Sequence, residues 1–259
     1  MISKTKRNII LSALVQFVVG LGFYYYSDFW YIGLIAIVAT SLYTYQTLIV
    51  KKPLASYWPK IVVPSLWLFL SYFYLYLVRH INSYTLVFFV PLAILVVAVY
   101  GFILHEQVSS QRRFLALDNV ISLVLIALLI NIASLMQVLW HWPAVLIMAF
   151  VWVFAFIIAL WWLLPLIGRM EYIAAIWAIV CVEICWVMSR WVVLYQLPRA
   201  KLVISQPALI IASLAYSWGG MYYHHKKGTL TRPLLFEYLA VSSIVFILVI
   251  VLTKWTTGY

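Results

Sequence analysis

Residues 91–104 read PLAILVVAVYGFIL, and residues 243–252 read SIVFILVIVL. Both runs are apolar on every face of a helix, and neither alternates between apolar and polar positions. A membrane β-barrel would instead show alternating segments of about ten residues. Because backbone groups within a bilayer must hydrogen-bond inside their own segment, these runs predict membrane-spanning helices.

The composition of the whole chain indicates the same class of protein. Of its 259 residues, 67% are hydrophobic and 9% are charged, and the mean hydropathy is +1.08. Soluble domains average about 45–50% apolar and about 25% charged residues. We therefore expect an all-α, polytopic transmembrane helical bundle that forms one transmembrane domain over residues 1–259. No soluble domain is expected, because no connection between apolar runs exceeds about a dozen residues.

The apolar runs predict nine spans, each long enough to cross a hydrocarbon core of about 30 Å. They cover residues 8–27, 30–50, 60–78, 84–105, 117–138, 142–166, 171–195, 202–224 and 233–253. The first run follows Lys4, Lys6 and Arg7 but lacks a small-residue cleavage site, so we interpret it as a retained helix and not as a signal peptide.

The basic residues predict the orientation, since cytoplasmic loops collect Lys and Arg. With the N-terminus inside, twelve basic residues face inward: Lys4, Lys6, Arg7, Lys51, Lys52, Lys60, Arg112, Arg113, Arg169, Lys226, Lys227 and Arg232. Four face outward: Arg79, Arg199, Lys201 and Lys254. Nine spans then place the C-terminus outside. The net charge of +11 is explained by this topology and by attraction to anionic inner-leaflet lipids, and no nucleic-acid partner is expected.

One acidic residue lies far from any predicted helix end. The other five fall in turns or near helix ends: Asp28, Glu106, Asp118, Glu171 and Glu237. Glu183 is about 18 Å beyond Glu171, near the middle of the hydrocarbon layer. A carboxylate at that depth costs at least about 2.5–3.5 kcal/mol on insertion scales. We expect Glu183 to face other helices or a wet cavity, or to be protonated.

Other polar residues are candidates to share a site with Glu183. Arg190 lies seven residues further on, on the same helical face, and about 10.5 Å along the axis. That gap favours contact through a second helix or water, and Arg190 has the alternative of snorkelling to the outer surface. Asn131 and Gln137 in the fifth span are expected mainly to hydrogen-bond between helices. The candidate pairing or transport site is thus Glu183, Arg190, Asn131 and Gln137.

The sequence contains few features that indicate an enzyme. The H-E-x-x-H, G-x-S-x-G and Walker patterns do not occur, so we predict no catalytic residue, no metal site and no cofactor. His224 and His225 stand beside Lys226 and Lys227, which is typical of contacts with lipid headgroups. Cys181 and Cys185 are interpreted as buried, reduced thiols that pack like small apolar side chains.

Residues 226–255, KKGTLTRPLLFEYLAVSSIVFILVIVLTKW, carry one resemblance. Through "LTR" followed by the helix start "EYL", this stretch resembles the end of uncharacterised polytopic membrane proteins of candidate-phyla bacteria with reduced genomes. The resemblance implies a multi-pass protein of the bacterial inner (plasma) membrane and carries no activity.

Three functions are consistent with these features. A non-catalytic scaffold or subunit of a membrane assembly, with a membrane-protein partner, fits the short loops and missing motifs best. A carrier of a small solute, ion or lipid would use a buried site at Glu183 and Arg190. An intramembrane protease or lipid-modifying enzyme comes third. The deciding feature is whether Glu183 and Arg190 line a water-accessible cavity or a dry helix contact.

Overall fold

The computed structural model describes residues 4–25, 35, 39, 58–81, 86–109, 115–163, 171–197 and 202–252. Within these residues the chain is almost entirely helical and forms eight α-helices. Its contacts divide it into two compact units, Met1–Leu115 and Ala116–Tyr259, which we describe separately.

The first unit contains α1 (Lys4–Tyr25), α3 (Trp58–Ile81) and α4 (Leu86–Ser109). Helix α4 packs on both α1 and α3. Trp67 Nε1 of α3 donates to the Val96 carbonyl of α4 at 3.0 Å, and Tyr72 OH of α3 donates to the Gln16 carbonyl of α1 at 3.0 Å. A Cβ atom at Gly20 would collide with the Tyr72 ring, so this glycine is what lets the tyrosine lie against α1.

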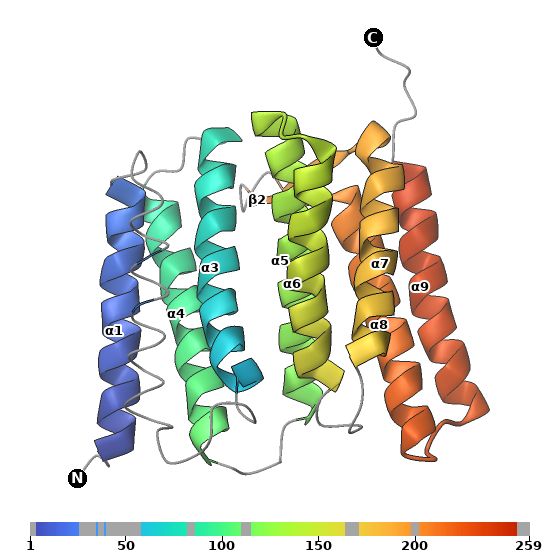
Figure 1. Cartoon of the computed structure of the whole chain (residues 1–259), viewed down its shortest axis with the longest axis horizontal. Coiled ribbons are helices and arrows are strands. Elements are labelled where there is room, and N and C mark those ends of the chain that lie inside the picture. Colours follow the sequence, from blue (N-terminus) through green and yellow to red (C-terminus); the bar gives the residue numbers. More distant parts are fainter. Residues whose placement is uncertain are drawn as a thin grey trace. The chain divides into compact units, whose positions relative to one another are not determined.

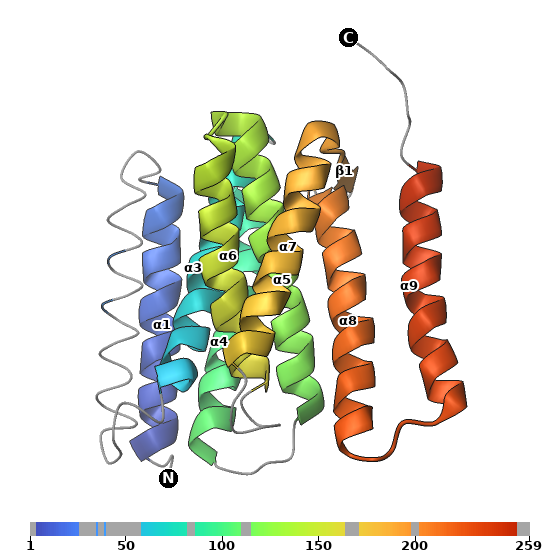
Figure 2. The same cartoon turned by 45° about the vertical axis from the view of Figure 1, so that its right-hand side comes forward.

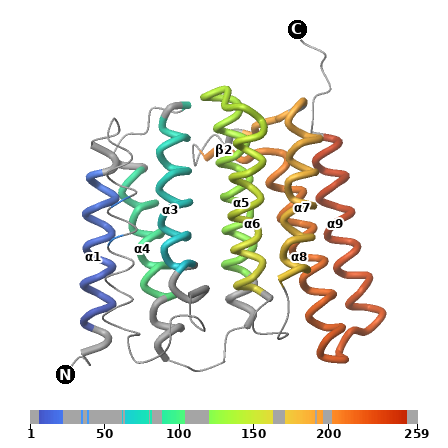
Figure 3. Tube along the Cα trace, viewed as in Figure 1, coloured from blue at the N-terminus to red at the C-terminus, as the bar shows by residue number. Residues whose placement is uncertain are grey.

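The second unit contains α5 (Leu115–Trp140), α6 (Ala144–Leu163), α7 (Glu171–Met188), α8 (Gln206–Lys226) and α9 (Arg232–Leu252). Successive helices run in opposite directions (Figure 1), and the trace in Figure 3 follows this alternation along the chain. Helix α6 packs on α7, α7 on α8, and α8 on α9. Figure 2 shows α9 at the edge of this unit, beside α8.

Four described helices are long and apolar enough to cross a membrane: Val120–Trp140, Ala144–Trp162, Glu171–Met188 and Arg232–Val251. The helical class predicted from the apolar runs is therefore confirmed, whereas membrane crossing by all nine predicted spans stays a prediction. The predicted span 30–50 lies outside the described residues except for Ile35 and Ala39.

The boundary between the seventh and eighth predicted spans is wrong. Helix α7 ends at Met188 instead of residue 195, and a 3-10 turn covers Ser189–Trp191. Two antiparallel strands follow, β1 (Leu194–Leu197) and β2 (Leu202–Ser205), with Leu194 opposite Ser205 and Leu197 opposite Leu202. The expectation of a purely α-helical chain is corrected by this hairpin. Arg199 and Lys201, predicted on the outer face, lie outside the described residues.

Local sequence is compatible with the extended segment and accounts for the start of α8. Val192 and Val193 are β-branched residues, which suit extended backbone as well as helix. Pro207 has no backbone N–H and is best tolerated in the first turn of a helix. Helix α8 accordingly begins at Gln206, after the extended N-cap residue Ser205. Pro207 thus starts this helix, and does not kink a helix running from residue 202.

The turn between α8 and α9 forms a well-defined cap. Gly228 adopts φ 66°, a left-handed conformation that favours glycine. The Gly228 N–H donates to the His225 carbonyl at 3.1 Å, and the Thr229 N–H donates to the His224 carbonyl at 2.9 Å. These two bonds make a Schellman motif that satisfies the last carbonyls of α8. Helix α9 then begins at Arg232, directly after Thr231.

Candidate functional site

Asn131 of α5 is the most deeply buried member of the predicted polar set. Its side chain is 6% exposed, and its Oδ1 accepts a hydrogen bond from the backbone N–H of Ser205 at 2.6 Å. Ser205 is the N-cap residue of α8, and the first N–H groups of a helix lack partners within the helix. Asn131 therefore fastens α5 to the start of α8, across 74 positions of sequence.

Gln137 lies two turns further along α5 and contacts the other end of the same connection. Its Nε2 donates to the backbone carbonyl of Ser189 at 2.7 Å, directly after α7 ends. The Ser189 hydroxyl in turn donates to the Trp186 carbonyl at 2.6 Å. Gln137 and Ser189 thus satisfy carbonyl groups that the end of a helix leaves without partners. The two polar residues of α5 thus bond to the chain just before the hairpin, at Ser189, and at its end, at Ser205.

Glu183 does not join Asn131 and Gln137. Its side chain is exposed on the surface of α7, and no ion pair joins it to Arg190 among the described residues. No described helix of this chain covers Glu183, so the expectation that it faces other helices or a wet cavity, or is protonated, stays a prediction. A small cavity of about 10 Å³ adjoins Gln137 and Cys185, with room for about one water molecule, but neither Glu183 nor Arg190 lines it.

The packing face of α7 explains why Glu183 points outward. The buried residues of this helix are Ala174, Trp177, Ala178, Cys181 and Cys185, and the two cysteines are free thiols. Glu183 is two residues from both cysteines, which is about 200° around the helix axis. Arg190 is also exposed, and it belongs to the 3-10 turn after α7 instead of to the helix itself.

The exposed side of α7 has a regular pattern. We call it the Glu183 face; it consists of Tyr172, Ile176, Ile179, Glu183 and Trp186. Its apolar members range from 47% exposed at Ile179 to 68% at Tyr172. The positions are spaced by four, three, four and three residues, which is the heptad spacing of helices that pack along a shared seam. One carboxylate thus lies within an apolar stripe shaped like a helix-packing surface.

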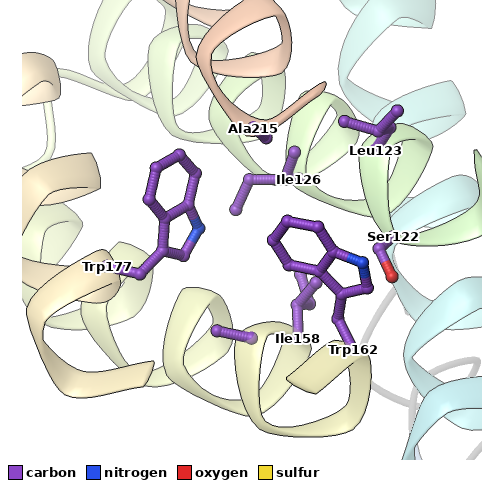
Figure 4. A pocket seen from close by; sticks show the side chains of 8 residues that line it. Ser122, Leu123, Ile126, Ile158, Trp162, Trp177 and Ala215 are labelled. Carbon is purple, nitrogen blue, oxygen red and sulfur yellow. The ribbon is translucent and has the colours of Figure 1, made fainter. Parts of the chain in front are cut away.

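Sequence reasoning missed a group of aromatic residues near the other end of the unit. A cavity of about 10 Å³ lies between α5, α6, α7 and α8, and Figure 4 shows the indole rings of Trp162 and Trp177 facing it. Trp162 lies against Gly219, where a Cβ atom would collide with the ring. The stretch YSWGGMYYHH, residues 216–225, held the available signal: a glycine pair flanked by large aromatic residues.

No family model matches the chain, and neither does any curated protein or solved structure. The resemblance of residues 226–255 to membrane proteins of candidate-phyla bacteria stays a prediction.

Replacing Asn131 tests its fastening role. Asn131→Leu keeps a similar size but leaves the buried Ser205 N–H without its acceptor, which costs about 1–3 kcal/mol. We expect the free energy of unfolding in detergent to fall by that amount. Ser134→Ala is the matched control on the same helix, because among the described residues the Ser134 hydroxyl bonds only to the Ile130 carbonyl of its own helix. Equal stability of the two variants would contradict this role.

Proposed function

We propose that this protein is a non-catalytic subunit of a membrane-protein assembly, and that its partner packs on the Glu183 face of α7. The single observation that carries the proposal is the exposed carboxylate of Glu183 inside the candidate span Glu171–Met188. The neighbours of Glu183 on this face are exposed and apolar on both sides of it.

The energetic argument starts from the surroundings of Glu183. An ionised carboxylate facing lipid near the centre of a bilayer costs at least about 2.5–3.5 kcal/mol on insertion scales. Charges within spans are therefore usually paired or face a protein interior. Because no helix of this chain covers Glu183 among the described residues, a partner helix is the economical way to remove the carboxylate from lipid.

The spacing of the face indicates the kind of contact. Heptad spacing supports packing of one helix along α7 at a shallow, left-handed crossing angle of about 20°. The carboxylate favours a partner span with a Lys or Arg at matching depth. A second copy of this chain in the same membrane orientation would pack in parallel and set Glu183 against Glu183, a repulsive pair of like charges. The partner that fits is therefore a different polypeptide.

The transport alternative needs Glu183 and Arg190 to line a water-filled path. Their exposure, and the pairing of Asn131 and Gln137 with backbone groups of the hairpin, favour the interface instead. Native mass measurement after gentle extraction tests the choice. The subunit proposal expects a second polypeptide in fixed ratio to this 30.0 kDa chain, whereas a carrier working alone would be recovered without one.

We further propose that the chain crosses a bacterial inner membrane nine times, with its N-terminus inside, its C-terminus outside and its basic loops on anionic lipids. The twelve-to-four distribution of basic residues supports this topology. We expect a reporter fused to the N-terminus to be accessible from the cytoplasm and one fused to the C-terminus to be accessible from outside. Both reporters responding on one side would contradict the nine-span topology.

A further inference from the structure

A second cavity in the same unit lies where α8 ends and α9 begins, and it is far larger than the one beside Trp177. Its volume is about 280 Å³. The wall is aliphatic on α5, at Val120 and Leu123. On α6, α8 and α9 the wall is aromatic, at Trp162, Tyr216, Tyr223 and Tyr238. Tyr216 is 37% exposed, so the cavity is accessible from the surface of the unit.

Two neighbouring glycines shape this cavity. A Cβ atom at Gly219 would collide with the Trp162 ring, and a Cβ atom at Gly220 would collide with the Tyr238 ring. Both rings can therefore lie directly against the backbone of α8. Tyr238 also meets the Tyr216 ring edge-on, with 5.3 Å between ring centroids, and its backbone carbonyl accepts from the Ser217 hydroxyl at 2.8 Å. The aromatic wall is thus fixed by close packing and hydrogen bonding.

Basic residues follow Tyr223 and His224, two of the residues that line the cavity. The Lys227 ammonium donates to the Tyr223 hydroxyl and lies 4.3 Å from the centroid of that ring. Lys226 is the preceding residue in the sequence, and its ammonium lies 5.7 Å from the centroid of the Tyr222 ring. His224 itself lines the cavity. Arg232 begins α9 after a short turn. Residues 222–238 thus contain three Lys or Arg residues, Lys226, Lys227 and Arg232, and one carboxylate, Glu237, which is exposed.

We propose that this cavity binds the phosphate-bearing end of an anionic phospholipid. The lipid phosphate accepts charge-assisted hydrogen bonds from Lys227 and its basic neighbours. The glycerol backbone and first methylenes of an acyl chain lie along the aromatic wall. At about 280 Å³ the cavity falls near the lower limit of about 300 Å³ for small-molecule pockets, so it suits this part of a lipid and not the whole molecule. The assignment is independent of any partner on the Glu183 face.

Lipid binding to the purified full chain tests the proposal, with phosphatidylglycerol, phosphatidylcholine and soluble glycerol 3-phosphate as probes in native mass spectrometry. We expect phosphatidylglycerol to bind most tightly. Lys227→Gln should weaken its binding about fivefold, which corresponds to about 1 kcal/mol for one basic residue near anionic lipid. Arg7→Gln on α1 of the first unit removes one exposed basic charge that does not line the cavity, and it should leave this affinity unchanged.

A photoreactive residue maps where the lipid lies. Benzoylphenylalanine at Tyr216, inside the cavity, should cross-link phosphatidylglycerol more than the same residue at Phe236, which is exposed on α9 outside the cavity lining. Equal binding of phosphatidylglycerol and phosphatidylcholine, or equal losses from Lys227→Gln and Arg7→Gln, would overturn the proposal. Binding of glycerol 3-phosphate as tight as that of the lipid would make a soluble phosphate ester the ligand, and would also overturn it.

Discussion

Glu183→Lys is expected to abolish recovery of the partner polypeptide while the chain itself still folds. The substitution places a positive charge opposite the basic residue expected in the partner span. Removing one member of a buried ion pair already costs about 3–5 kcal/mol, which is a loss of at least about 100-fold in affinity, and charge reversal adds repulsion. The readout is the ratio of partner to this chain after extraction from native membranes.

Two further substitutions separate association from folding. Because Glu183 is exposed, Glu183→Leu should leave the unfolding midpoint of the chain unchanged and still reduce partner recovery. Glu237→Lys makes the same charge reversal at an exposed position on α9 and should leave partner recovery intact. Loss of folding in Glu183→Leu, or full partner recovery in Glu183→Lys, would contradict the assigned role of the Glu183 face.

Gly219→Ala should produce a large loss of stability within the second unit. The added Cβ atom collides with the Trp162 ring, and overpacking of this kind typically costs about 1–3 kcal/mol. We expect the free energy of unfolding to fall accordingly. Gly22→Ala on α1 is the matched control, because no described residue lies within 4 Å of the position of its added Cβ atom. There the better helix propensity of alanine should raise stability by about 0.5–1 kcal/mol.

The two glycine substitutions are expected to change stability in opposite directions, which distinguishes the packing effect at Gly219 from a general effect of alanine. Trp162→Leu replaces the ring that the added Cβ atom meets. Gly219→Ala should therefore lower the free energy of unfolding less in the Trp162→Leu background than beside the intact tryptophan. A double-mutant cycle over these two sites measures that coupling. If Gly219→Ala and Gly22→Ala change the free energy of unfolding in the same direction and by the same amount, close packing of Trp162 does not require glycine at position 219.

Much of the helical layout follows from hydropathy alone. The ninth predicted span, 233–253, differs by one residue at each end from α9, Arg232–Leu252. Hydropathy failed after Met188, since an apolar run such as Val192–Val193 or Leu202–Ile204 supports either a helix or a buried strand. The start of α8 was predictable from Pro207, which the first turn of a helix tolerates but the interior does not.

The direction of Glu183 was harder to predict than its depth. Depth follows from counting residues along a helix, but direction depends on which side of α7 packs on α6 and α8. Because α7 is apolar on every side apart from Glu183, hydropathy gives little indication of its packing face. The small residues Ala174, Ala178, Cys181 and Cys185 were the available signal, since small side chains favour close packing between membrane helices. They place the packed side of α7 opposite Glu183.

Photo-cross-linking from Ile179, one helical turn from Glu183 on the same face, is the most direct test of the subunit proposal. Benzoylphenylalanine at Ile179 is compared in native membranes with the same residue at Val153, which is exposed on α6. We predict one discrete adduct from Ile179, joined to a membrane span of another polypeptide with a Lys or Arg near its centre, and lipid adducts alone from Val153. The adduct should disappear in Glu183→Lys. Lipid adducts alone from Ile179, or a cross-link only within the chain itself, would contradict the proposal that the Glu183 face binds a partner.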